Sequence, residues 1–175
     1  QNIQSVFLDG RSVCQGYAKA MQYLLQKEGI QTLLVTGQTN GEGHAWDLVL
    51  ADGAYYYLDP TWGDASYSKA EESTENVRIP SINYDYFLVT TQELEKTHQL
   101  DESIPLPECT ADADNYYVRE GLYLDAYNED QIKWIFEKAQ QSQTGYLPEE
   151  VYERLAPLLR KTPLSYTWNG KRFVR

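Results

Sequence analysis

Three segments of the chain decide the predicted fold: SVCQGYAKA at 12–20, GHAWDLV at 43–49 and YYYLDPTW at 55–62. Ser12 and Gln15 form an S-x-x-Q pattern, which is typical of a capping box at a helix N-terminus. Apolar residues then recur at near-helical spacing, and Gly29 provides a C-terminal stop. Cys14 is therefore expected in the first helical turn, where unpaired backbone N–H groups favour a thiolate and can donate to an oxyanion.

The second and third segments predict a β-hairpin. They flank Asp52-Gly53, a strong signal for a two-residue turn. If these two residues form the whole loop, His44 and Asp59 lie on the same sheet face as diagonal neighbours, about 7–8 Å apart at the backbone. A carboxylate and an imidazole can bridge that gap. A slip of one residue in the register would place them on opposite faces.

Each of these residues also has an ordinary structural explanation. A single cysteine is most often a small buried apolar residue, and a single histidine is most often hydrogen-bonded within the structure. Asp59, which precedes Pro60, is typical of a turn. However, one of only two cysteines lies at a helix start, and one of only two histidines lies on the same strand face as an aspartate. The combination favours a nucleophilic Cys–His–Asp site.

In this order and context, the segments resemble the transglutaminase-like branch of the papain-like cysteine enzymes, and the bacterial members most closely. The resemblance rests on VCQGYA, GHAWD and YYLDPTW and covers roughly residues 9–87. It implies that Cys14 is the nucleophile, His44 the base and later the acid, and Asp59 the group that orients the imidazole. It also implies that an amide carbonyl is attacked to give a thioester, which water or an amine then resolves. Only thirteen residues precede Cys14, so the helical lead-in usual in the family is expected to be truncated.

The predicted fold is α+β, of the papain-like or transglutaminase-core type, with the nucleophile helix packed on an antiparallel sheet. Residues 1–107 are assigned to the catalytic core and residues 108–175 to a C-terminal accessory α/β portion packed on it. The further predicted elements are a strand at 31–36, a loop at 37–43, an acidic loop at 64–79, a strand at 84–89, a short helix within 90–99 capped by Thr91, two strands within 115–127, a helix at 129–143 capped by Asn128, a helix at 148–160 and a hairpin about Asn169-Gly170.

Further residues are predicted to support the site or line its cleft. Trp46 and Trp62 flank the His–Asp pair and are expected to cover the imidazole, although packing alone also accounts for two tryptophans. His98, which follows Lys96-Thr97, is interpreted as a solvated or helix-capping histidine and is left out of the site. The remaining predicted support residues are Gly16, Tyr17, Gly43 and Thr61.

Composition excludes several other classes of function. The net charge of −11 argues against a nucleic-acid partner, and no apolar run is long enough to span a membrane. The two cysteines and two histidines lack metal-ligand spacing, so neither a metal nor another cofactor is expected. A disulfide between Cys14 and Cys109 would remove the nucleophile. The active-site interpretation therefore predicts two free thiols, while a redox-regulated pair remains the alternative.

The leading functional hypothesis is a cysteine-dependent enzyme that acts on amide bonds, either a peptidase or amidase or a transglutaminase-type acyltransferase. Its expected partner is a peptide or protein substrate, in the cell wall or at the cell surface. The alternative hypothesis is a non-catalytic protein- or glycan-binding domain that keeps the fold. Bacterial members of the family are often secreted, which favours an extracellular or cell-surface location and leaves a cytoplasmic one open. Because the chain begins at Gln1 without Met, it is expected to be a fragment or a processed form.

Overall fold

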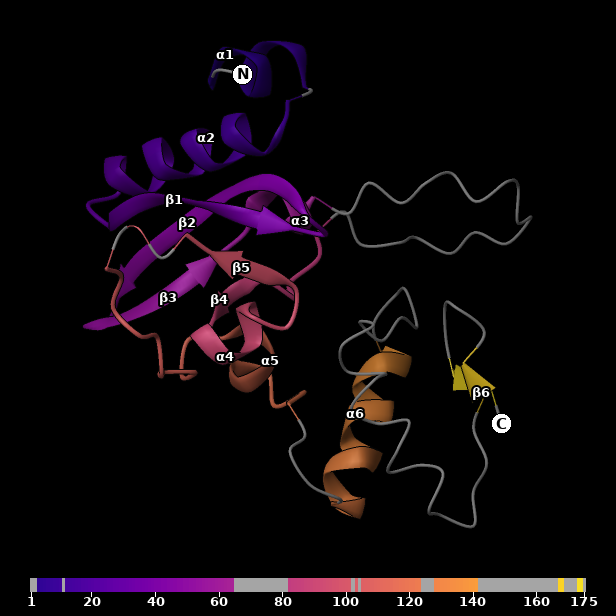
Figure 1. Cartoon of the computed structure of the whole chain (residues 1–175). Coiled ribbons are helices and arrows are strands. Elements are labelled where there is room, and N and C mark those ends of the chain that lie inside the picture. The colour runs from indigo at the N-terminus through magenta and orange to yellow at the C-terminus, as the bar shows by residue number, and fades with distance from the viewer. Residues whose placement is uncertain are drawn as a thin grey trace. The chain divides into compact units, whose positions relative to one another are not determined.

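The computed structural model describes residues 3–10, 12–64, 82–101, 103, 105–123, 128–141, 167–168 and 173–174 (Figure 1). The chain forms two compact units, one of residues 1–64 and 86–116 and the other of residues 65–85 and 117–175. Residues 108–116 thus belong to the first unit, although the sequence analysis assigns them to the C-terminal portion. Helices and an antiparallel sheet are combined, as the predicted α+β class requires.

The first unit is built on a five-stranded antiparallel sheet with the strand order β4-β3-β2-β1-β5. The strands are β1 (Gln31–Thr39), β2 (Glu42–Ala51), β3 (Ala54–Leu58), β4 (Phe87–Val89) and β5 (His98–Leu100). The helices are α1 (Ile3–Asp9), α2 (Cys14–Lys27), α3 (Pro60–Gly63) and α4 (Thr91–Leu94). Between β4 and β5 the chain passes through α4 from one edge of the sheet to the other.

Helix α2 begins at Cys14, but the predicted capping box is wrong. Val13 is the N-cap, and no side chain caps the helix. The Ser12 hydroxyl instead lies 2.9 Å from the Ser5 hydroxyl, on α1. The predicted stop is confirmed: Gly29 has a φ of 79° and donates its N–H to the Gln26 carbonyl.

Helix α2 brings Cys14 to the end of the sheet at which β2 begins. A short turn joins α2 to β1, and the helix packs back against β1 and β2 (Figure 1). The helix has 14 residues, and it spans about 21 Å at a rise of 1.5 Å per residue. The strand from Gln31 to Gly37 covers about 20 Å at 3.3 Å per residue. Gly37 pairs with His44, so Cys14 and His44 lie at the same end of the sheet.

The predicted register of the hairpin formed by β2 and β3 is confirmed. Ala51 pairs with Ala54 and Asp47 pairs with Leu58, as a two-residue loop requires. Both loop residues, Asp52 and Gly53, have positive φ values of 45° and 83°. Such values are typical of the type I′ turn that matches the twist of the flanking strands.

The predicted loop at 37–43 is wrong, because most of it is strand. Asn40 and Gly41 have φ values of 52° and 79° and form a second tight turn. This turn lets β1 continue to Thr39 and β2 begin at Glu42. Asn-Gly is a strong hairpin signal, and here it extends both strands to the position of His44.

At Gly37 the hairpin of β1 and β2 packs closely against Gln99 and Trp46. A Cβ atom added there would lie 2.1 Å from the Gln99 carbonyl oxygen and 2.5 Å from the Trp46 ring. Gly37→Ala is therefore expected to lower the free energy of unfolding by about 1–3 kcal/mol or more in urea denaturation. Gly43→Ala is the matched control, since nothing lies within 4 Å of its added Cβ. Equal stability of the two variants would contradict the packing described.

One hydrophobic cluster of the first unit joins the sheet to α4. Its buried members are Val35, Trp46, Leu48, Tyr57, Val89, Leu94 and Cys109. Cys109, predicted to lie in a loop, contributes its side chain to this core. Cys14 and Cys109 are both free thiols, as predicted.

Several predicted elements after residue 80 need correction. Strand β4 is shorter than the predicted 84–89, and the cap of α4 is Thr90, whose hydroxyl accepts from the Glu93 amide, instead of Thr91. Residues 116–119 form helix α5 (Tyr116–Arg119), where a strand was predicted. His98 lies in β5 and not at a helix end.

In the second unit, the longest described element is α6 (Glu129–Gln141). The predicted cap is confirmed, because the Asn128 side chain accepts from the Gln131 amide at 3.1 Å. Strands β6 (Thr167–Trp168) and β7 (Phe173–Val174) pair with each other, so a C-terminal hairpin is present. Its predicted two-residue turn at Asn169-Gly170 is wrong, because Trp168 pairs with Phe173 and residues 169–172 lie between them. The predicted helix at 148–160 and nearly all of the acidic loop at 64–79 lie outside the described residues. Among the helices described, none has both the length and the apolar character that crossing a membrane requires.

Candidate active site

His44 and Asp59 are in direct contact. His44 Nε2 lies 2.7 Å from Asp59 Oδ2, and the Asp59 side chain is fully buried. His44 stands near the start of β2, and Asp59 directly follows β3. The sequence-based prediction that the two side chains share a sheet face is therefore confirmed.

The position of Asp59 is fixed by its role as the cap of α3. Its Oδ1 accepts from the Thr61 amide at 2.8 Å and from the Trp62 amide at 3.2 Å. The Asp59 amide in turn donates to the Tyr86 carbonyl at 3.0 Å, next to an irregularity between β3 and β4 where Leu88 has a φ of 55°. Bulges of this kind often re-aim a side chain beside a functional site. Here one carboxylate oxygen is held by backbone and the other faces the histidine.

Asp59 is a carboxylate at neutral pH. Its burial alone would raise its pKa, but hydrogen bonds from His44 and His98, the charge of His44 and the Trp62 amide together lower it to about 2. A carboxylate held in this way stabilises the fold above its unfolded pKa of about 3.9, and this stability is lost as the pH falls through about 2.

His98 also binds Asp59, and the sequence analysis missed it. His98 Nε2 lies 3.1 Å from Asp59 Oδ2, and His98 is 1 % exposed, so the interpretation as a solvated histidine is wrong. Strand β5 brings it there by pairing His98 with Thr39, far away in the sequence. A weak signal was present in the sequence: the polar residues Thr97 and Gln99 alternate with His98 and Leu100, in the period of two that is typical of a strand.

Aromatic rings surround the two imidazoles. The ring centroids of Trp46 and Trp62 lie 5.9 Å and 6.2 Å from that of His44, which fits their predicted place beside the imidazole. The same two rings lie 4.9 Å and 4.8 Å from the His98 ring, and the Tyr86 ring lies 5.0 Å from it. Packing of this kind restricts the rotation of both imidazole rings and limits the access of water to them.

Cys14 is partly exposed at the first residue of α2. The helix makes its first hydrogen bond from the Gly16 amide to the Val13 carbonyl at 2.8 Å. Within the part of the chain that the structure describes, the amides of Cys14 and Gln15 therefore remain without a partner. Both can donate to an anion at the helix N-terminus.

Tyr17 ties the first turn of α2 to the end of α3. Its hydroxyl donates to Asp64 Oδ2 at 2.6 Å, and this bond raises the pKa of Tyr17. Helical residues three apart share a face, so Cys14 is on the side of α2 that meets α3. Asp59, the cap of α3, lies at the other end of that short helix.

The structure thus brings His44 and Asp59 into contact and places Cys14 at the same end of the sheet. Among the described residues, no hydrogen bond joins the Cys14 thiol to His44 or engages His44 Nδ1. Nδ1 is consequently the ring nitrogen open to proton exchange with a thiol. Of the other predicted support residues, Gly16 is buried, Gly43 is exposed, and Thr61 contributes its backbone amide.

The His–Asp–His cluster also has the composition of a metal site. One ligand atom from each of His44, Asp59 and His98 lies within 4.8 Å of the others. Two imidazoles and a carboxylate suit several divalent transition metals. Hydrogen bonds from both Nε2 atoms to the one carboxylate oxygen account for this close approach without an ion.

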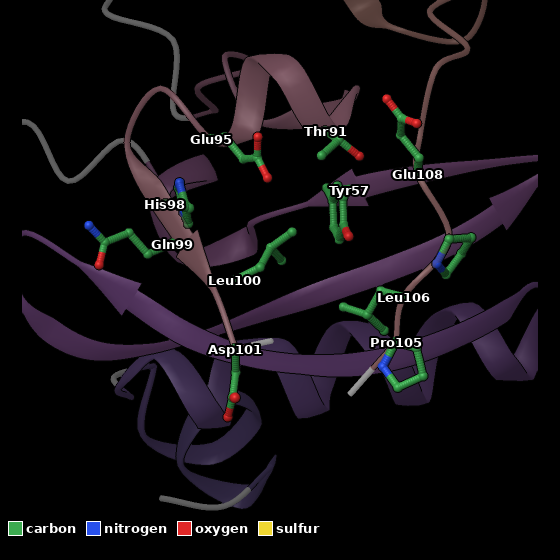
Figure 2. A pocket seen from close by; sticks show the side chains of 11 residues that line it. Tyr57, Thr91, Glu95, His98, Gln99, Leu100, Asp101, Pro105, Leu106 and Glu108 are labelled. Atoms are coloured by element: carbon green, nitrogen blue, oxygen red, sulfur yellow. The ribbon is translucent and has the colours of Figure 1, made fainter. Parts of the chain in front are cut away.

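A pocket of about 680 Å³ adjoins the cluster at His98 (Figure 2). Leu100 and Leu106 form apolar parts of its wall, and Glu95 and Thr91 lie on its α4 side. Cys14, His44 and Asp59 are not among its lining residues, so this pocket is not the predicted substrate cleft.

Asp47 is a second buried carboxyl group in the same hairpin. It is 0 % exposed, and neither of its oxygens has a hydrogen-bond partner among the described residues. Burial raises the pKa of Asp47 to about 8, and the charge of nearby Asp59 adds to the effect. Asp47 is therefore largely a neutral acid at neutral pH, in contrast to Asp59.

The raised pKa of Asp47 predicts a pH-dependent stability. Between about pH 4 and about pH 8 the folded chain keeps a proton that the unfolded chain has lost, so stability falls as the pH rises. Asp47→Asn removes this titration and is expected to flatten the slope, with a gain on the order of a few kcal/mol near pH 8. Urea unfolding at several pH values measures it. Asp52→Asn, at an exposed turn position that suits asparagine, is the control and should keep the wild-type slope.

No protein-family model matches the chain, and no curated protein matches it either.

Proposed function

We propose that this chain is a cysteine-dependent enzyme that acts on amide bonds of peptides or proteins through a thioester. In this proposal the fold is of the papain-like or transglutaminase-core type, and Cys14, His44 and Asp59 are the catalytic residues. The observation that carries it is the 2.7 Å contact between His44 Nε2 and a buried Asp59 carboxylate. It fixes the tautomer in which Nδ1 is left to accept a proton from a thiol.

The first half of the reaction forms the thioester. His44 Nδ1 takes the proton of Cys14, and the thiolate adds to the amide carbonyl carbon to give a tetrahedral oxyanion. The amides of Cys14 and Gln15, which have no hydrogen-bond partner among the described residues, would donate to that oxyanion. The C–N bond then breaks, and His44 returns the proton to the departing amine or ammonia. Asp59 stabilises the imidazolium throughout.

The second half releases the acyl group. His44 removes a proton from a water molecule or an amine, which attacks the thioester carbonyl. The C–S bond breaks, and Cys14 leaves as the thiolate, which the imidazolium again neutralises. Water gives hydrolysis and an amine gives acyl transfer. A protein substrate at the bacterial cell surface or in the cell wall fits the family resemblance and is part of this proposal.

Trapping of the acyl-enzyme tests the proposal. Glutamine-containing peptides are incubated with the wild-type chain, and intact-mass and peptide mapping follow the covalent adduct, ammonia release and incorporation of a labelled primary amine. We expect an adduct on Cys14 that Cys14→Ala abolishes and that Cys109→Ala leaves in place. Turnover that persists in Cys14→Ala would contradict the assignment of the nucleophile.

One observation favours the alternative of a non-catalytic binding domain, namely that no hydrogen bond joins Cys14 to His44 among the described residues. In a binding domain, Cys14 would react with alkylating reagents as an ordinary thiol. Its reactivity would then be independent of His44, and no substrate peptide would form an adduct.

A further inference from the structure

His98 makes the same kind of contact with Asp59 as His44 does. Both Nε2 atoms lie within hydrogen-bond distance of one oxygen, Asp59 Oδ2, at 2.7 Å from His44 and at 3.1 Å from His98. A carboxylate oxygen only accepts, so both Nε2 atoms carry protons and donate. Asp59 Oδ2, which orients His44 in the proposed mechanism, is therefore held by two imidazole donors.

The other nitrogen of His98 is also engaged. Nδ1 lies 2.9 Å from the Thr97 hydroxyl, and the Thr97 hydroxyl lies 2.8 Å from the Tyr86 hydroxyl. Nε2 donates to Asp59, Nδ1 is paired with the Thr97 hydroxyl, and that hydroxyl is paired with the Tyr86 hydroxyl. A continuous chain of hydrogen bonds thus runs from Tyr86, through Thr97 and His98, to Asp59.

The ring of His98 is held firmly. It is 1 % exposed and is enclosed by the rings of Trp46, Trp62 and Tyr86 at centroid distances of 4.8–5.0 Å. Pairing with Thr39 fixes its backbone. A group with both nitrogens bonded and every side packed can impose an orientation on the carboxylate that it contacts.

We propose that His98 is a positioning residue of the active site, which holds the Asp59 carboxylate from a second side and aims Asp59 Oδ2 at His44. This inference rests on the proposed function. A merely structural histidine would contribute to folding stability, but its loss would leave the His44–Asp59 hydrogen bond and the turnover of folded molecules unchanged. The two roles can therefore be separated by experiment.

Two substitutions of His98 make the test. His98→Gln keeps an N–H donor close to the position of Nε2, whereas His98→Leu fills similar space without one. We expect His98→Leu to lower kcat by about 10- to 100-fold with little change in KM, since outer partners of functional imidazoles contribute on this scale. His98→Gln is expected to restore most of the lost rate. Equal kcat values for His98→Leu and wild type would overturn the proposal.

A second measurement does not depend on turnover. The Nε2 proton of His44 is followed by NMR, and its exchange with water is compared among the wild type and the two variants. We expect slow exchange in wild type and His98→Gln, and fast exchange in His98→Leu. Unchanged protection in His98→Leu overturns the proposal whether or not the chain is an enzyme. Loss of protection in a chain that forms no acyl adduct would refute the proposed function alone.

Thr97→Val provides a milder variant in case His98→Leu does not fold. Thr97 is exposed, and its substitution keeps the shape of the side chain but removes the hydroxyl that bonds His98 Nδ1, Tyr86 and the Leu94 carbonyl. We expect a smaller loss of kcat in the same direction and faster exchange of the His44 proton. Thr110→Val, also at an exposed threonine, is the matched control and should resemble the wild type. Identical behaviour of the two threonine variants would count against the chain of hydrogen bonds.

Discussion

Replacement of His44 by alanine is expected to lower the kcat of amide turnover by at least about 10⁴-fold, because members of a nucleophilic triad act as a unit. Without the imidazole, no group is placed to remove the Cys14 proton or to protonate the departing amine. Asp59 would keep His98 and two backbone amides as donors, so the fold should persist. Steady-state kinetics on a glutamine peptide, with circular dichroism to confirm folding, measures this effect.

Added imidazole tests whether the loss of activity in His44→Ala is due to the missing chemical role of the side chain. If the side chain acts chemically, added imidazole should restore part of the activity by entering the space that the ring leaves. Wild-type turnover in His44→Ala without any additive would show that His44 is not the base.

Asp59→Asn is the second substitution with a large expected effect, about 10⁴-fold in kcat by analogy with other triads. An amide NH₂ facing the two Nε2 atoms cannot accept from them. His44 then loses both its orientation and the charge that stabilises its protonated form. A buried donor left without an acceptor costs about 1–3 kcal/mol, so the free energy of unfolding should also fall.

Asp64→Asn is the matched control for Asp59→Asn, because it makes the same chemical change at the other end of α3. Asp64 accepts one exposed hydrogen bond from Tyr17, and the amide oxygen of an asparagine can still accept it, so this substitution should cost little. Kinetics and urea unfolding of both variants are compared. Similar losses in the two variants would show that Asp59 has no special role.

Local sequence signals were sufficient for the hairpin that carries the candidate site. Asp52-Gly53 fixed the register, and with it the contact between His44 and Asp59, because a two-residue turn leaves only one alignment of the strands. The place of Cys14 in the first turn of α2 was also predicted, although it was inferred from a capping box that Ser12 does not form. Short-range chemistry determines these features.

What the sequence analysis missed depends on long-range pairing or on buried environment. His98 looked solvated beside Lys96, and only the pairing of β5 with β1 brings it to Asp59. The neutral state of Asp47 likewise arises from burial by distant elements, which no local pattern reports. Asn40-Gly41 is a hairpin-turn signal of the same kind as Asp52-Gly53. Because it was not interpreted as a turn, residues 37–43 were predicted to be a loop although most of them are strand.

The most direct test of the central claim, a Cys14 thiol coupled to His44, is the rate of Cys14 alkylation by iodoacetamide as a function of pH. Peptide mapping resolves the two thiols, and Cys109 serves as an internal control because burial raises its pKa to about 11. We predict a rate already at its plateau near pH 6 in the wild type and a profile shifted towards about pH 8.5, the midpoint of an ordinary thiol, in His44→Ala. An ordinary profile that is the same in both proteins would contradict the account.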